Sequence, residues 1–268
     1  MVHDGVLQGV IDLHLHLGPD PYVPRFYDVE EAALRAAEAG MGGFVFKSHS
    51  YDTAPIARVV GDRYPSLVIA GGITLDPPVG GLNPRAVEAA ARLGARVVWM
   101  PTGERPSVMD DGAPGKLAPG MMEILEIVRD HGMILATGHL PAAEVVVLTA
   151  EARAMGVRKV VVTHAMNRRV GPDLPIEAQW ELAEMGAYIE HCATILEAPK
   201  AVALPDLLQA IAVVGDARVV LSSDFGKRDH GDPIRGFEAF AQRLLAAGLT
   251  VAQVGRMTRE TPRRLLET

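Results

Sequence analysis

The feature that most constrains the fold of this chain is a regular alternation of two kinds of segment. Short apolar runs rich in valine and isoleucine are separated by stretches rich in alanine, glutamate and arginine with helical spacing. Nearly continuous apolar runs are typical of strands buried on both faces of a parallel sheet. The sequence predicts eight such strands: Val10–Leu17, Gly43–His49, Leu67–Leu75, Arg96–Pro101, Met133–His139, Lys159–His164, Ala187–Ala193 and Arg218–Asp224.

The stretches between the strands carry residues that typically begin helices. Asp28 is placed to cap a helix over Val29–Ala39, and Asn83 and Asp232 each stand directly before a proline. A further helix is predicted near Val251–Glu267. The pattern therefore places a helix after each strand.

Eight strands that alternate with eight helices in 268 residues predict a (β/α)8 barrel. The alternative is an open, doubly wound sheet, which would have a glycine-rich phosphate-binding turn after its first strand. This chain has His14–Pro19 at that place instead. No linker or change of composition divides the chain, so we expect one domain over residues 1–268.

The composition argues against several classes of protein. The net charge of −7 and the lack of a basic stripe argue against a nucleic-acid partner. The single cysteine, Cys192, excludes an intrachain disulfide and is typical of a reducing compartment. No apolar run is long enough to span a membrane, and the first residues do not resemble a signal peptide. We therefore expect a cytoplasmic protein without a membrane partner.

Histidines gather at the carboxyl ends of the predicted strands. In a barrel these ends meet at one mouth, where such folds hold their active sites. A strand histidine on its own is usually a core or rim residue, but six at one mouth indicate a metal or catalytic site. Asp224 ends the eighth strand. Six of the nine histidines lie near predicted strand ends, and they are His14, His16, His49, His139, His164 and His191.

The first strand contributes two of these histidines to one face. Residues two apart on a strand point the same way, so we expect Asp12, His14 and His16 to share a face. A catalytic zinc site needs about three protein ligands and an open position. His14 and His16, joined by His139 and Asp224 from other strands, meet that need.

With these motifs the chain resembles the amidohydrolase superfamily of metal-dependent hydrolases. Ile11–His16 resembles its D-x-H-x-H signature on the first strand, and Thr137–His139 falls where its strand-five histidine belongs. Val162–His164 and Leu221–Asp224 resemble its strand-six histidine and strand-eight aspartate. Met257–Leu266 resembles the helix that often ends such chains, so the resemblance spans the whole sequence.

The resemblance implies a set of metal ligands. His14, His16 and Asp224 would hold a divalent metal, with zinc as the expected ion. His139 would bind the same ion or a second one. His164 would be either a ligand of a second metal or a catalytic histidine that polarises the substrate. The resemblance leaves open whether one or two ions are bound.

The chain departs from the family in two ways. It lacks the β-sandwich that many members add, so the resemblance implies a bare barrel. The predicted fourth strand also lacks the lysine or glutamate that bridges two metals in many members. The nearest acidic residue, Glu104, lies in the following loop. A standard binuclear centre is therefore not expected.

Lys47 on the second strand is a candidate catalytic or binding residue, because it shares a face with His49 and is predicted at the mouth. It would either be carboxylated and bridge two metals, or bind the substrate as a cation. Other cations that follow strand ends are candidates for binding a substrate carboxylate, although each alone is typical of a solvated surface residue. They are Arg25, Arg168, Arg169, Lys227 and Arg228.

Together these residues predict an enzyme that hydrolyses an amide, cyclic amide, lactone or similar ester-like bond in a small molecule. A metal would activate water, Asp224 would act as general base, and His164 or Lys47 would stabilise the oxyanion. The cations favour an anionic substrate, and we expect a homo-oligomer. The main alternative is a mononuclear decarboxylase of an unsaturated or aromatic acid, which would also lack the strand-four bridge. A phosphoesterase and a non-catalytic metal-binding barrel have less support in the residues.

Overall fold

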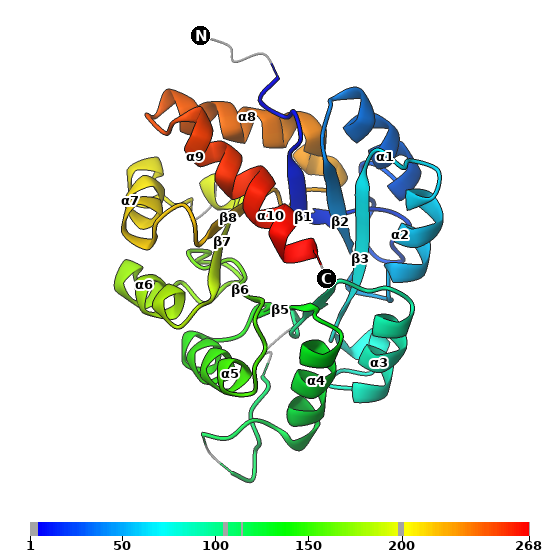
Figure 1. Ribbon diagram of the computed structural model, residues 1–268, viewed down its shortest axis with the longest axis vertical. Coiled ribbons are helices and arrows are strands. Elements are labelled where there is room, and N and C mark those ends of the chain that lie inside the picture. Colours follow the sequence, from blue (N-terminus) through cyan, green and yellow to red (C-terminus); the bar gives the residue numbers. More distant parts are fainter. Residues whose placement is uncertain (1–4, 104–106, 114, 198–200, 268) are drawn as a thin grey trace.

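Eight parallel strands stand in chain order in one sheet, which confirms the predicted (β/α)8 barrel (Figure 1). The computed structural model describes residues 5–103, 107–113, 115–197 and 201–267. The strands are β1 (Ile11–His16), β2 (Gly43–Lys47), β3 (Val68–Thr74), β4 (Val97–Trp99), β5 (Ile134–Ala136), β6 (Val160–Val162), β7 (Tyr188–Cys192) and β8 (Val219–Ser222).

The first and last strands meet and close the barrel. Leu15 forms a parallel bridge with Phe225, which follows β8. The backbone N–H of His16 donates to the carbonyl of Phe225 at 2.9 Å, and that of Asp224 donates to the carbonyl of His14 at 2.8 Å. An open, doubly wound sheet is therefore excluded, and closure brings three of the predicted site residues together.

A ring of helices surrounds the strands, one after each (Figure 1). The predicted caps are confirmed, because Asp28, Asn83 and Asp232 each accept backbone hydrogen bonds at the start of a helix. The helices of the ring are α1 (Val29–Glu38), α2 (Ala54–Gly61), α3 (Pro84–Arg92), α4 (Pro119–Asp130), α5 (Ala142–Ala154), α6 (Ile176–Glu184), α7 (Leu204–Val214) and α8 (Pro233–Ala246).

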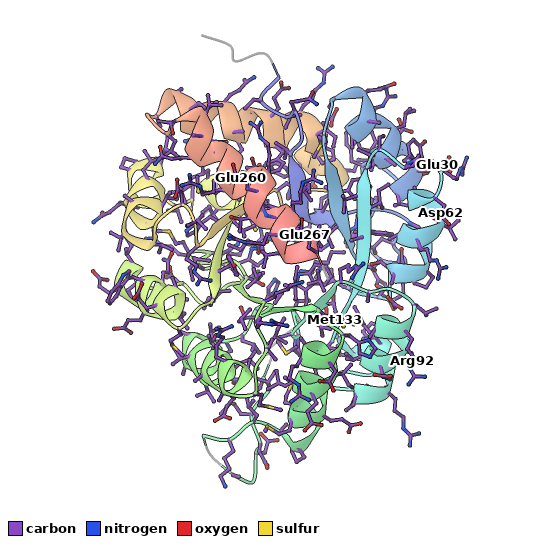
Figure 2. All side chains as sticks on the ribbon, in the orientation of Figure 1. Glu30, Asp62, Arg92, Met133, Glu260 and Glu267 are labelled. Atoms are coloured by element: carbon purple, nitrogen blue, oxygen red, sulfur yellow. The ribbon has the colours of Figure 1, made fainter. Side chains whose placement is uncertain are left out.

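The last helical segment crosses the end of the barrel at which the strands begin. It consists of α9 (Val251–Gly255), a π-helical stretch (Arg256–Glu260) and α10 (Thr261–Leu266). Glu260 and Glu267 are labelled on it in Figure 2. Leu265 and Leu266 pack with residues of the barrel interior. This end is closed by apolar side chains, which leaves the opposite end for the site.

The eight strands all end earlier than predicted, and after β5, β6 and β8 the site residues follow in short turns. β6 ends two residues before His164, β8 ends two residues before Asp224, and β5 ends three residues before His139. The backbone turns out of the extended conformation at these places. His164 and Asp224 have φ of 55°, and Gly138 has φ of 60°. Non-glycine residues seldom adopt this left-handed conformation, which costs energy that the surrounding structure must offset.

A bulge in β1 corrects the expectation that Asp12 shares a face with the two histidines. The pairing of β1 with β2 shifts by one residue between Asp12 and Leu15. Leu13 packs in the barrel interior, and His14 also lies on the inner side. Asp12 instead uses Oδ1 to accept hydrogen bonds from the backbone N–H groups of His14 and Ser223 at 3.1 and 3.0 Å. Asp12 therefore joins β1 to the end of β8.

A long loop follows β4. Met109 and Leu117 form an antiparallel bridge within it. Glu104, the acidic residue nearest to β4 in this loop, lies outside the described residues. Among the described helices, none has the length and apolar character needed to cross a membrane.

Candidate metal centre

Two imidazoles from β1 and one carboxylate after β8 converge at the mouth of the barrel. Nε2 of His14 and Nε2 of His16 each lie 3.3 Å from Oδ1 of Asp224. One ligand atom from each of these three residues lies within 4.8 Å of the others, so the group could hold a metal ion. The candidate ligands His14, His16 and Asp224 are thus adjacent.

His164 lies beside this group. Its Nε2 is 3.8 Å from Oδ2 of Asp224, and its ring centroid is 4.9 Å from that of His14. The same oxygen of Asp224, Oδ2, also accepts a hydrogen bond from the hydroxyl of Thr194 at 3.0 Å. His164 is therefore a fourth possible metal ligand, and it faces the carboxylate of Asp224.

The charges of these groups suit a divalent cation. Burial lowers the pKa of His16 well below its ordinary value and that of His164 to about 4, so both rings are neutral at pH 7. Burial opposes ionisation of Asp224, but the neighbouring His164, His14 and His16 outweigh it and hold its pKa well below the usual range. Neutral imidazoles and an ionised carboxylate are ligands that zinc and similar ions prefer.

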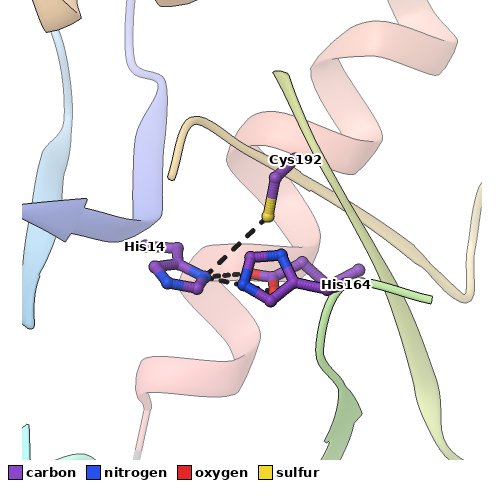
Figure 3. Close-up of side chains that lie close together, drawn as sticks. His14, His164 and Cys192 are labelled. Carbon is purple, nitrogen blue, oxygen red and sulfur yellow. Dashed lines mark hydrogen bonds and ion pairs between the residues drawn. The ribbon is translucent and has the colours of Figure 1, made fainter. Parts of the chain in front are cut away.

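Glu190 and Cys192 on β7 contact His14 from its other side, and the sequence analysis did not identify them as site residues. The two carboxylate oxygens of Glu190 each lie 3.3 Å from Nδ1 of His14. Sγ of Cys192 lies 3.9 Å from the same nitrogen (Figure 3). His14, His164, Glu190 and Cys192 form a second group that could hold a metal. The only signal in the sequence was a glutamate next to His191 in a predicted buried strand.

Glu190 is ionised although it is buried. Burial would raise its pKa, but His14, His164 and a hydrogen bond from Ser222 lower the pKa to about 2. The hydroxyl of Ser222 donates to Oε1 at 2.7 Å. Burial raises the pKa of Cys192 well above its ordinary value, so its sulfur stays a protonated thiol. A thiol is a poor metal ligand compared with a thiolate.

Lys47 lies inside the candidate centre rather than in solvent. Its side chain is 1% exposed, and its Nζ lies 3.0 Å from Nε2 of His14 and 5.5 Å from the ring centroid of Trp99. Burial lowers the pKa of Lys47, while the charges of Asp224 and Glu190 oppose that shift. The amine therefore faces the same ring nitrogen as the carboxylate of Asp224.

His139 and His49 line the cavity next to the centre, and both are held through Thr102. Nδ1 of His139 lies 2.9 Å from the carbonyl oxygen of Thr102, and the His139 ring is 5.2 Å from that of His164. Nδ1 of His49 lies 3.0 Å from Asp76 and 2.7 Å from the Thr102 hydroxyl. Neither histidine belongs to the two groups of described side chains that lie close enough together to hold a metal ion.

His191 is the one histidine of the predicted six that does not face the mouth. Glu190 and Cys192, its neighbours on β7, both contact His14, so alternation turns His191 to the opposite side of the strand. It is fully buried, and neither ring nitrogen has a hydrogen-bond partner in the part of the chain that the structure describes. Burial lowers its pKa to about 4, which keeps the ring neutral.

A cavity of about 310 Å³ opens beside the centre. Its size is at the lower end of pockets that bind small molecules. Its wall includes apolar side chains such as Val23, Met166 and Ile195. Four of the five candidate substrate-binding cations also line it, and only Arg228 of that set does not; the four are Arg25, Arg168, Arg169 and Lys227.

The cations at this cavity differ in how they are paired. Nε and Nη2 of Arg25 both donate to one oxygen of Asp20, at 2.9 and 2.6 Å. Arg168 lies 3.6 Å from Asp173. Arg169 and Lys227 have no side-chain partner among the described residues. Arg169 and Lys227 are thus the cavity cations whose positive charge is least neutralised by a carboxylate.

Several solved enzyme structures have the same architecture. An amidohydrolase from Pseudomonas aeruginosa shares 14% sequence identity at a TM-score of 0.64, over 98% of this chain and 96% of that one. A dihydroxybenzoic acid decarboxylase from Polaromonas sp. JS666, with bound manganese and 2-nitroresorcinol, shares 14% at 0.62, over 97% of both chains. Dipeptidase AC, a metallopeptidase, shares 14% at 0.62, over 97% of this chain and 98% of that one. These enzymes confirm the expected barrel fold, and the likeness of this chain to them is one of fold.

Comparison of the sequence itself gives a family without an assigned activity. A search of curated proteins found no match. A family model described as a family of unknown function, DUF6282, matches residues 9–190. This range covers more than half of the 268 residues and includes β1 to β6 with the candidate ligands His14, His16 and His164. The chain belongs to the DUF6282 family.

Proposed function

We propose that this protein is a metal-dependent enzyme that hydrolyses an amide, cyclic amide, lactone or similar ester-like bond in a small anionic molecule. The observation that carries the proposal is the position of Asp224. Its carboxylate touches Nε2 of both His14 and His16, yet its side chain remains 19% exposed and lines the cavity. One residue can therefore contact both a metal and a substrate.

His14, His16 and Asp224 are the proposed ligands, with His164 beside them, and zinc is the proposed ion. A divalent ion bound there would supply Lewis-acid and water-activating chemistry. The ionised Asp224 accepts the proton of the attacking water and returns it to the leaving group. The hydrogen bond from Thr194 to its Oδ2 keeps the carboxylate oriented during this transfer.

A single ion fits the described residues better than two. β4 (Val97–Trp99) is entirely apolar and supplies no bridging carboxylate. Lys47 is the proposed substrate-binding cation, because its amine lies 3.0 Å from Nε2 of His14 in the candidate centre. A buried donor at this position would stabilise the oxyanion that develops on a carbonyl substrate. His164 and Lys47 thus share the stabilising role.

The proposed substrate carries a negative charge. The chain has a net charge of −7, yet four arginine and lysine side chains line the cavity against the two carboxylates of Glu197 and Asp224. A positive cleft in an acidic protein concentrates anionic ligands at the site. Arg169 and Lys227 would bind the substrate anion, since Arg25 is already paired with Asp20.

Decarboxylation of an unsaturated or aromatic acid is the second candidate. The apolar β4 favours it, since a mononuclear site is what this reaction needs. A dihydroxybenzoic acid decarboxylase is also among the enzymes with a similar fold. The same cavity, with apolar side chains in its wall and the cations Arg169 and Lys227, would accommodate an aromatic carboxylate.

The first experiment measures metal. The double variant His14→Ala/His16→Ala and the wild type are purified in parallel, and bound zinc, manganese and iron are determined by elemental analysis. We expect about one ion per wild-type chain and almost none in the variant. Metal retained by the variant at the wild-type ratio contradicts the proposed centre.

The second experiment separates the two reactions. The zinc and manganese forms are tested against lactones, cyclic amides and dipeptides with a pH indicator, and against 2,6-dihydroxybenzoate for carbon dioxide release. Hydrolysis without carbon dioxide release supports the first proposal, and carbon dioxide release supports the second. Activity that persists equally in Asp224→Asn contradicts both, because each relies on this carboxylate at the metal.

A further inference from the structure

The carboxylate of Glu190 lies behind His14, on the side away from Asp224. Both of its oxygens are 3.3 Å from Nδ1 of His14, while Nε2 of the same ring faces Asp224 and Lys47. Glu190 is 3% exposed and His14 is completely buried. The ring of His14 is therefore held between a carboxylate on one nitrogen and the candidate metal centre on the other.

The hydrogen-bonding capacity of these groups determines which nitrogen of His14 carries the proton. A carboxylate only accepts hydrogen bonds, so its contact with Nδ1 requires a proton on Nδ1. In a neutral ring, Nε2 then keeps its lone pair. The ammonium or amine of Lys47 can donate to that lone pair at 3.0 Å, which agrees with the same tautomer. A neutral imidazole with a free Nε2 is the form that binds a metal.

Glu190 is itself fixed by its surroundings. The hydroxyl of Ser222, on the neighbouring strand β8, donates to Oε1 at 2.7 Å, and the Ser222 oxygen also lies 3.4 Å from Sγ of Cys192. A carboxylate with one hydrogen bond from a buried hydroxyl and another from an imidazole has little freedom to rotate. Ser222 and β7 thus determine where the acceptor for His14 lies.

We infer that Glu190 is a positioning residue that sets the orientation and the tautomer of His14, so that Nε2 binds the metal. The inference rests on the proposed metal centre. The second metal-type group, His14, His164, Glu190 and Cys192, then holds no metal of its own, and Glu190 supports the first group instead. All four side chains of that second group are buried, whereas a catalytic metal needs a position open to water or substrate. Only the group with Asp224 reaches the cavity.

The test compares zinc affinity in matched variants. Zinc binding to the metal-free full-length protein is measured by competition with a chromophoric chelator. Glu190→Met removes the acceptor at similar volume, and Glu190→Gln keeps one acceptor oxygen. We expect the zinc dissociation constant to rise by about 10- to 100-fold in the Met variant, to rise less in the Gln variant, and the stoichiometry at saturating zinc to stay that of the wild type.

Cys192→Ala serves as the matched control from the same face of β7. It removes the sulfur 3.9 Å from Nδ1 of His14 without touching the carboxylate. We expect a zinc dissociation constant within threefold of wild type. Loss of a zinc equivalent at saturation in Cys192→Ala or Glu190→Met would show that β7 supplies ligands, and it would overturn the inference. An affinity of Glu190→Met within threefold of wild type overturns it as well.

A spectroscopic measurement on the wild type tests the inference without metal. Nitrogen-15 spectra of the metal-free, histidine-labelled wild type report which ring nitrogen of His14 is protonated, with His14→Ala used for assignment. We expect protonation on Nδ1, and protonation on Nε2 overturns the inference. If the wild type binds no zinc or manganese, the proposed function fails, and this tautomer measurement still decides the role of Glu190.

Discussion

Replacement of Asp76 by asparagine tests the electrostatics beside the candidate centre. Asp76 lies just after β3 and is 4% exposed. Its Oδ1 accepts hydrogen bonds from the backbone N–H groups of Thr102 and Gly103 at 2.6 and 3.1 Å, and its Oδ2 contacts His49 and the Thr102 hydroxyl. Asparagine preserves the shape and one acceptor oxygen but removes the charge. The variant therefore isolates the contribution of the carboxylate.

The size of the effect follows from the pKa of this carboxyl group. Burial would raise the pKa, but the hydrogen bonds from His49 and Thr102 outweigh it and lower the pKa from 3.8 to about 2. A carboxylate whose folded pKa is depressed contributes stability above its unfolded pKa and loses it as the pH falls through its folded pKa. A shift of this size corresponds to about 2 kcal/mol at pH 7. That contribution decreases between about pH 4 and pH 2.

The measurement is urea unfolding followed by circular dichroism, on metal-free protein so that metal binding adds no stability. We expect Asp76→Asn to be about 2 kcal/mol less stable than wild type at pH 7, with a melting temperature about 4–8 °C lower. The difference should shrink below pH 4. Asp111→Asn is the control, since Asp111 is exposed and makes no hydrogen bond or ion pair within the described residues. If both variants match wild type at pH 7, the reasoning is wrong.

Three further predictions concern the centre itself. Asp224→Asn should reduce turnover of the proposed substrates by more than a hundredfold, and a loss within about tenfold, roughly 1.4 kcal/mol, would be too small for a general base. Lys47→Ala should leave the metal content unchanged and raise the Michaelis constant, whereas loss of one metal equivalent would indicate a carboxylated bridge. Gly226→Ala should lower both the melting temperature and the bound metal, because Gly226 has φ of +133° and a Cβ there would lie 1.8 Å from the carbonyl oxygen of His16. Wild-type metal content in that variant would contradict this last expectation.

The sequence predicted the architecture because each of its signals is local. Continuous apolar runs locate all eight strands, and Asp28 and Asn83 mark helix starts that the structure confirms. The strand ends were predicted too late at His164 and Asp224. Nothing in the identity of a histidine or an aspartate shows that it adopts a positive φ, since that conformation is imposed by the fold around it.

The other differences depend on how the barrel closes. The bulge in β1 changes which residues face inward, so strict alternation misplaced Asp12. Glu190 lies against His14 only because β7 comes next to β8 and the barrel brings both to β1. Periodicity determines that Glu190 and His191 point in opposite directions, but it does not determine which of them points inward. Distances across a barrel are properties of the closed sheet.

The left-handed backbone conformation of His164 and Asp224 creates a conflict between the stability of the fold and the activity of the site. A glycine at either position would adopt the same backbone with less strain, and the strain of a non-glycine residue there is of the order of 1 kcal/mol. The substitutions that relieve it are also those that remove a candidate ligand. A selection for thermal stability alone would therefore enrich inactive variants at these two positions. Engineering of a more stable form should keep both residues unchanged and seek its gains in the helical ring.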